Sequence, residues 1–124
     1  MAAALALAGG LALGAQEIHY STYLGGSDED QGRAIAVSPS GNACVAGTTL
    51  SPDFPVNSGG AVPESEFLRL NGFASILGPR GGLEYSALIG RPFVNEIAED
   101  VAVDPTGRVY VAGWTSGLED QEVF

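Results

Sequence analysis

The fold of this chain is decided by a stretch of sequence that occurs twice. Residues 35–49 read IAVSPSGNACVAGTT, and residues 101–115 read VAVDPTGRVYVAGWT. The two stretches align without a gap, with the proline, the turn glycine and the Val-Ala-Gly run in register. Such an internal repeat is typical of architectures that copy one supersecondary unit and stack the copies.

Each copy has the pattern of a β-hairpin. In the first copy, β-prone runs at 34–37 and 43–48 flank the turn sequence SPSGN. Proline presets φ for the second position of a type I turn, and glycine supplies the positive φ that follows it. We therefore predict hairpins with structural turn residues at Ser38, Gly41, Asp104 and Gly107. The side chains of Ser38 and Asp104 can accept hydrogen bonds from the backbone of their own turns.

The repeat also includes a strand upstream of each hairpin. Residues 20–25 read YSTYLG and residues 85–90 read YSALIG, at an offset of 65 rather than the 66 of the hairpins. Apolar and polar residues alternate along 18–24, which is the period-2 signature of a strand. We predict strands near 18–24, 34–38, 43–48 and 73–77, with 85–89 opening the next unit.

A unit of about 65 residues with four short strands fits one blade of a β-propeller, with the loop from Leu50 to Asn71 accounting for its excess length. The predicted fold class is therefore all-β, with blades of four antiparallel strands. Residues 1–15 form a signal-like apolar segment, 16–84 a first blade and 85–124 part of a second. A solenoid or a sandwich built from the same hairpins is the alternative.

These motifs resemble the bacterial SBBP-type β-propeller repeat. The resemblance rests on Tyr20–Ser27, Ala34–Val37, Gly41-Asn42, Val45–Thr49 and Asp53-Phe54-Pro55, and further on Gly60-Ala61 and Phe73–Leu77. It implies a multi-blade propeller in a secreted or surface bacterial protein, and it implies no catalytic motif. Because closed propellers have typically 4–8 blades, we expect a fragment of a larger propeller. A short chain whose copies assemble into a ring is the alternative.

Composition excludes several classes of function. The net charge is −10, and all five basic residues are arginines, which argues against nucleic acid and anionic membrane surfaces as partners. The single cysteine excludes a disulfide within the chain and a cysteine-based zinc site. No apolar run reaches the length of a membrane span. Residues 1–15 contain only Met, Ala, Leu and Gly, which fits either a secretory signal or a mis-assigned start inside a longer chain.

The densest acidic cluster is Asp28-Glu29-Asp30. Asp28 and Asp30 are candidate calcium ligands, because calcium is bound by carboxylate and carbonyl oxygens. The alternative is a solvated loop, or a carboxylate that caps backbone N–H groups. Asp30 aligns with Glu96, so an acid recurs once per unit, which favours a structural role. We expect no other cofactor and no catalytic residue.

The remaining reactive residues fit structural roles. The acidic pairs Glu99-Asp100 and Glu119-Asp120 indicate surface positions, and His19 has no nucleophile near it in sequence. No Gly-x-Ser-x-Gly elbow and no phosphate-binding loop is present. Cys44 aligns with Tyr110 inside a strand, where we expect a small buried side chain. We expect the aromatic residues to serve blade packing rather than ligand binding, namely Tyr20, Tyr23, Tyr85, Tyr110 and Trp114.

We therefore expect a structural or interaction module that presents loops, chiefly 50–71, from a rigid blade scaffold. Its expected partners are neighbouring blades, other copies of the chain, or an extracellular protein or carbohydrate. The alternatives are a scaffold for an enzyme whose catalytic residues lie outside this chain, and a calcium-stabilised repeat.

Overall fold

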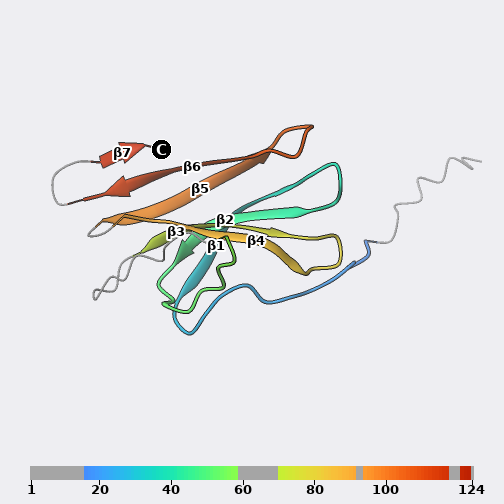
Figure 1. Cartoon of the computed structure of the whole chain (residues 1–124), viewed down its shortest axis with the longest axis horizontal. Coiled ribbons are helices and arrows are strands. Elements are labelled where there is room, and N and C mark those ends of the chain that lie inside the picture. Colours follow the sequence, from blue (N-terminus) through green and yellow to red (C-terminus); the bar gives the residue numbers. More distant parts are fainter. Residues whose placement is uncertain (1–15, 59–69, 92–93, 118–120, 124) are drawn as a thin grey trace, which may run out of the picture.

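The computed structural model describes residues 16–58, 70–91, 94–117 and 121–123. These residues form seven β-strands and no helix, and they are arranged as two antiparallel sheets (Figure 1). The predicted all-β class is therefore confirmed. None of the described residues lies in a helix that is long and apolar enough to cross a membrane. The signal-like segment 1–15 falls outside the described residues.

The first sheet has four strands in sequence order. They are β1 (Asp30–Val37), β2 (Ala43–Thr49), β3 (Asn71–Leu77) and β4 (Leu83–Ile89). The second sheet contains β5 (Asn95–Val103), β6 (Val109–Ser116) and the short β7 (Gln121–Val123), again in sequence order. Each strand pairs antiparallel with the next, which is the meander expected of a propeller blade.

Three hairpin turns share one geometry and lie at the same end of the molecule (Figure 1). Their sequences are SPSGN at 38–42, GPRGG at 78–82 and DPTGR at 104–108. In each turn the first N–H donates to the fifth carbonyl at 2.8 to 3.0 Å. The fourth residue is a glycine with φ between 83° and 88°, in the left-handed region that favours glycine.

One predicted strand is wrong. Residues 16–29 form no strand, whereas the strand predicted at 85–89 is present as β4, which pairs with β3 and completes the first sheet. The physical reason is that a strand exists only where another strand satisfies its backbone N–H and C=O groups. Residues 18–24 correspond to β4 at the offset of 65, yet no described strand lies beside them. The first sheet therefore runs from 30 to 89, one strand out of phase with the sequence repeat.

The two sheets pack face to face through small apolar residues. Strand β5 lies against β1, β2 and β3. At the centre, Ala46 and Ala98 are fully buried, and Cys44 and Val101 are nearly so. Small side chains let the two sheets approach closely, and β-branched side chains of β5 and β6 fill the space around them. The surrounding residues are Ala34, Ala36, Ile76, Val103, Val109 and Val111.

The opposite face of the first sheet is covered by the start of the long 50–71 loop. Phe54 stacks on Phe73 with ring centroids 4.6 Å apart, and both rings are buried. Asn57 lies along the outer edge of β4, where its Oδ1 accepts the Ser86 N–H at 2.7 Å and its own N–H donates to the Ser86 carbonyl at 3.1 Å. Residues 50–58 are thus fastened to the blade, while 59–69 lie outside the described residues.

Candidate functional site

The acidic cluster proposed as a calcium site lies where the chain enters β1. Asp30 Oδ2 accepts hydrogen bonds from the Gly26 N–H at 2.7 Å and from the Ser51 hydroxyl at 2.9 Å. Asp28 Oδ1 instead accepts the N–H of its neighbour Glu29 at 2.8 Å. Asp30 therefore ties Gly26 to Ser51, and Asp28 holds the backbone of Glu29. We call this junction, formed by residues 26–30, 51 and 53, the corner before β1.

Asp53 completes this corner from the other side. Its Oδ1 accepts both the N–H of Ser27, at 2.7 Å, and the Ser27 hydroxyl, at 2.8 Å. These two hydrogen bonds stabilise the ionised carboxylate and hold the pKa of Asp53 below its ordinary value. Gly26 lies so close to Asp53 and Ser51 that a Cβ on it would collide with both. The corner ties the segment before β1 to the segment after β2.

The second sheet has an equivalent corner built with different donors. Glu96 aligns with Asp30 and is only 2% exposed. Arg91 donates through Nε to Glu96 Oε1 at 3.1 Å and through Nη2 to the Thr115 hydroxyl at 3.2 Å. A carboxylate at the start of the first strand thus recurs in both sheets and receives donors from the preceding connection.

No group of three or more His, Cys, Asp or Glu side chains that could hold a metal ion is found within the described ranges. Asp30 Oδ1 is buried without a hydrogen-bond partner there, but its carboxylate is already held by Gly26 and Ser51. Calcium takes six to eight oxygen ligands. Calcium binding by Asp28 and Asp30 stays a prediction.

Asp104 organises the β5–β6 turn. Its Oδ1 accepts the Thr106 hydroxyl at 2.6 Å and the N–H groups of Thr106 and Arg108 at 2.9 and 3.0 Å. Its Oδ2 accepts Arg108 Nε at 2.7 Å and the Tyr110 hydroxyl at 3.1 Å. These hydrogen bonds, of which the one from the Thr106 hydroxyl contributes most, hold the pKa of Asp104 far below its ordinary value. The Asp104 carboxylate in turn raises the pKa of Tyr110.

Ser38 takes the place of Asp104 in the first sheet. Its hydroxyl accepts the Asn42 N–H at 3.0 Å and lies 2.8 Å from the Ser40 hydroxyl. The two turns therefore use different side chains at one repeat position to hold the same backbone shape.

A cross-sheet ion pair joins two residues that the sequence analysis did not single out as a pair. Arg33 Nη1 lies 3.0 Å from both carboxylate oxygens of Glu99, and Trp114 Nε1 donates to Glu99 Oε1 at 3.1 Å. Arg33 and Glu99 stand 66 residues apart, so they occupy one repeat position. Both fall at a register shift of their strand, where a bulge redirects the side chain. Opposite charges at aligned positions were the signal that could have revealed the pair.

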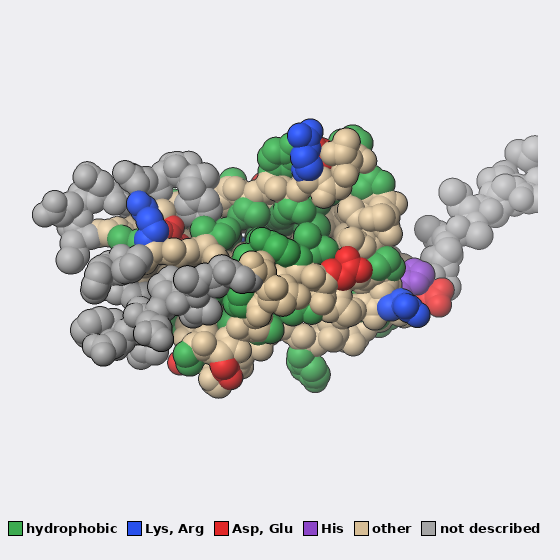
Figure 2. All heavy atoms as spheres, viewed as in Figure 1, with side chains coloured by type: hydrophobic (Ala, Val, Ile, Leu, Met, Phe, Trp, Pro, Cys, Tyr) green, Lys and Arg blue, Asp and Glu red, His purple; other side chains and the backbone are tan. Residues whose placement is uncertain are grey.

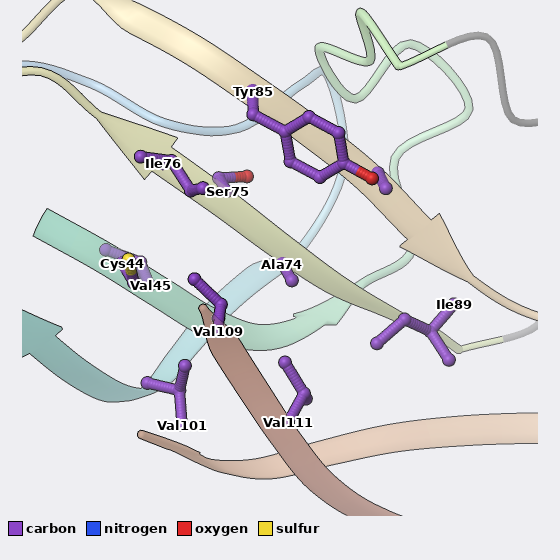
Figure 3. A pocket seen from close by; sticks show the side chains of 11 residues that line it. Cys44, Val45, Ala74, Ser75, Ile76, Tyr85, Ile89, Val101, Val109 and Val111 are labelled. Carbon is purple, nitrogen blue, oxygen red and sulfur yellow. The ribbon is translucent and has the colours of Figure 1, made fainter. Parts of the chain in front are cut away.

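An apolar crevice of about 240 Å³ separates the outer part of the first sheet from β6. Figure 3 shows Val109 and Val111 projecting from β6 into the space in front of β3 and β4. Ile76, Tyr85 and Ile89 line the opposite wall. In the space-filling view, apolar side chains gather in the middle of the face shown, with acidic and basic side chains nearer its edges (Figure 2). No sequence motif pointed to this crevice.

The other candidate residues lie apart from one another. Cys44 is buried in the core between the sheets, and burial raises the pKa of its thiol. His19 is exposed, and Tyr23 is fully exposed in the segment before β1. Tyr20 lies over the turn glycine Gly81. The pair Glu119-Asp120 falls outside the described residues.

A four-stranded and a three-stranded antiparallel meander, packed face to face and built with equivalent turns and strand junctions, define a repeat protein of the β-propeller class. The sequence model of the SBBP β-propeller repeat family matches residues 19–55 and 84–118, more than half of the chain. The chain belongs to this family, as the resemblance implied. No curated protein and no solved structure matches the chain at a significant level. The second match begins within β4, so the family repeat also starts one strand before the sheet.

Proposed function

We propose that this chain is a structural and interaction module of an exported bacterial protein, with no catalysis of its own. In this role it stacks β-propeller blades and holds their connecting loops in place for a protein or carbohydrate partner. Its secreted or cell-surface location is part of the proposal.

One observation carries the proposal: among the described residues, several acidic side chains fix strand junctions and turns of the blades. Asp30 and Glu96 fix equivalent strand junctions, and Asp104 fixes a turn with all of its hydrogen bonds inside residues 104–110. A catalytic acid or base must keep a proton-transferring oxygen available to substrate. Carboxylates held in this way support a framework rather than a reaction.

Export is tested by expressing the chain with a C-terminal tag in a bacterial host and separating cytoplasm, envelope and medium. We expect the tagged chain in the envelope or the medium, and a matched variant with residues 2–15 deleted in the cytoplasm. Equal retention of both chains in the cytoplasm would overturn the exported location.

Partner binding is tested with the purified chain on a glycan array and against extracellular matrix proteins. Saturable binding to one class would support the interaction role. Hydrolysis of a bound glycan by this chain alone would instead favour the enzyme alternative. Thermal unfolding with and without a chelator tests the calcium alternative, for which we expect an unchanged melting temperature, because Asp28 and Asp30 already have protein partners.

A further inference from the structure

Both outer faces of the two-sheet stack expose apolar side chains. Ala34 and Ala36 of β1 pack against the second sheet. Because side chains alternate along a strand, Ile35 and Val37 point to the opposite face, where they are 67% and 65% exposed. On the far side of the stack, Tyr110 of β6 is 53% exposed. Apolar patches exposed in this way mark interaction surfaces.

The outer face of the second sheet contains a shallow hollow of about 140 Å³, which we call the β5–β6 hollow. Ala112 lies there at the repeat position of Ala46, and Tyr110 at that of Cys44. The Tyr110 hydroxyl is held by Asp104 Oδ2 at 3.1 Å, which anchors the larger side chain toward its turn. The hollow is therefore the counterpart of the small-residue surface that the first sheet buries. Its lining consists of Asp100, Val101, Ala102, Tyr110, Val111 and Ala112.

The buried contact between the two sheets shows what fits such a surface. There Val101 packs in one cluster with Ala46, and Val103 packs against that cluster. Ile35 and Val37 occupy the repeat positions of these two valines in the first sheet. One outer face thus carries the branched side chains and the other carries the small ones. Because these faces lie on opposite sides of the stack, a second copy of the chain is needed to join them.

The charges beside these faces also match. Arg33 of the first sheet and Glu99 of the second occupy one repeat position and pair at 3.0 Å, yet their side chains stay 35% and 40% exposed. A second copy that continues the stack brings its Arg33 to Glu99 of the first copy. Two copies that met through their second sheets would instead bring Glu99 and Asp100 of each copy together, and like charges oppose that contact.

We propose that a second copy of the chain docks head to tail, with Ile35 and Val37 of its first sheet seated in the β5–β6 hollow of the first copy. The contact repeats, between molecules, the packing of the two sheets within one chain. A head-to-tail contact leaves one face of each kind free on a pair, so it continues into a ring or an open row of copies. This inference rests on the proposed structural role, and it names the partner as another copy of the chain.

The first test is sedimentation velocity on the full chain over a range of concentrations. We expect the unmodified chain to self-associate. Ile35→Asp, which places a charge on the inserting face, and Ala112→Arg, which fills the hollow, should each weaken association at least tenfold. Circular dichroism verifies that each variant is folded. An unmodified chain that is monomeric throughout, or association that survives either substitution, would overturn the proposal.

Arg80→Gln is the matched control for charge. It makes the net charge more negative by one unit, as Ile35→Asp does, but it lies exposed in the turn between β3 and β4, outside both faces. This variant should associate like the unmodified chain. An equal loss of association in Arg80→Gln would mean that net charge controls the association, which would overturn the proposed contact.

A mixture of the two interface variants tests the head-to-tail geometry. The Ile35→Asp chain retains an intact hollow, and the Ala112→Arg chain retains an intact inserting face. Equal amounts together should therefore form a 1:1 dimer and nothing larger, although each variant alone is monomeric at the same concentration. A mixture that stays monomeric, or that forms larger species, would overturn the proposal.

These results are separable from those for the proposed function. A chain that is exported and binds a glycan, yet stays monomeric, refutes the head-to-tail contact alone. A chain that forms this contact but remains in the cytoplasm refutes the exported location alone.

Discussion

At Gly107 the backbone has φ of 88°, while a Cβ placed there would meet no atom within 4 Å. Gly107→Ala therefore introduces backbone strain without a steric clash. We expect the free energy of unfolding to fall by about 1–2 kcal/mol, the cost of a left-handed conformation for an L-residue. Urea denaturation measures the change.

The matched control is Gly82→Ala. A Cβ on Gly82 also meets no atom, but its φ lies outside the left-handed region. Equal losses of stability in the two variants would contradict an origin in backbone strain.

The Asp104 carboxylate gives the stability of the chain a defined pH dependence. Its pKa is lowered in the folded state, chiefly by the Thr106 hydroxyl, so ionised Asp104 stabilises the fold above its unfolded pKa, near 4. That contribution is lost as the pH falls from about 4 through the lower folded pKa. We expect Asp104→Asn to be less stable than the unmodified chain at pH 6, with the difference shrinking toward pH 2.

Ser38→Ala is the control for this titration. It removes the hydroxyl that accepts the Asn42 N–H in the equivalent turn, and no carboxylate is involved. Urea denaturation at several pH values should show a constant deficit for Ser38→Ala. A constant deficit for Asp104→Asn as well would count against the carboxylate as the source.

At the scale of the strand, Asn57 protects the outer edge of β4. Its side chain accepts the Ser86 N–H and donates to the Glu84 carbonyl at 3.3 Å. Asn57→Ala should lower the free energy of unfolding by about 1 kcal/mol and increase aggregation, because an edge strand loses its cover. Urea denaturation and light scattering are the measurements. Ser58→Ala is the neighbouring control, which should cost little because the Ser58 hydroxyl is buried without a hydrogen-bond partner within the described part of the chain.

The Arg33–Glu99 pair links β1 to β5 through two bulges. Its side chains are 35% and 40% exposed, so solvent screening limits its strength. A double-mutant cycle with Arg33→Met and Glu99→Gln should give a coupling of about 0.5–1 kcal/mol that declines as salt is added. A coupling near zero at low salt would mean that the bulges, rather than the charges, align the two strands.

For the whole molecule, the two sheets should unfold as one unit because their shared core is small and closely packed. The chain has one tryptophan, Trp114, which reports on the second sheet, while circular dichroism reports on both. We expect the two signals to give coincident urea transitions. Ala46→Leu, at a fully buried contact between the sheets, should cost about 1–3 kcal/mol and separate the transitions. Ala102→Leu, on the exposed far face, should neither lower the stability nor separate the two transitions.

The hairpins were predictable because their signals are local. Pro39 and Gly41, and their counterparts Pro105 and Gly107, set turn dihedrals within four or five residues. The third turn, at 78–82, carries the same Pro and Gly spacing and joins β3 to β4. The strand predicted at 18–24 was wrong, since its alternation is correct but pairing depends on a partner strand that no local pattern specifies.

The candidate site was likewise predictable only in part. The recurrence of an acid at Asp30 and Glu96 was visible in the repeat, but its donors, Gly26 and Ser51 in one sheet and Arg91 in the other, come from segments that meet only in the folded chain. The same holds for Arg33 and Glu99, which are 66 residues apart and are brought together by stacking of the sheets.

The sequence by itself determined the class of fold, the turns and the repeat, because period-2 alternation and turn dihedrals are properties of neighbouring residues. Only the tertiary structure decided which strands pair within each sheet and which carboxylates are engaged in holding them. Those features depend on backbone partners and side-chain contacts between distant segments, and hydrogen bonds and apolar burial select them only when the sheets are assembled.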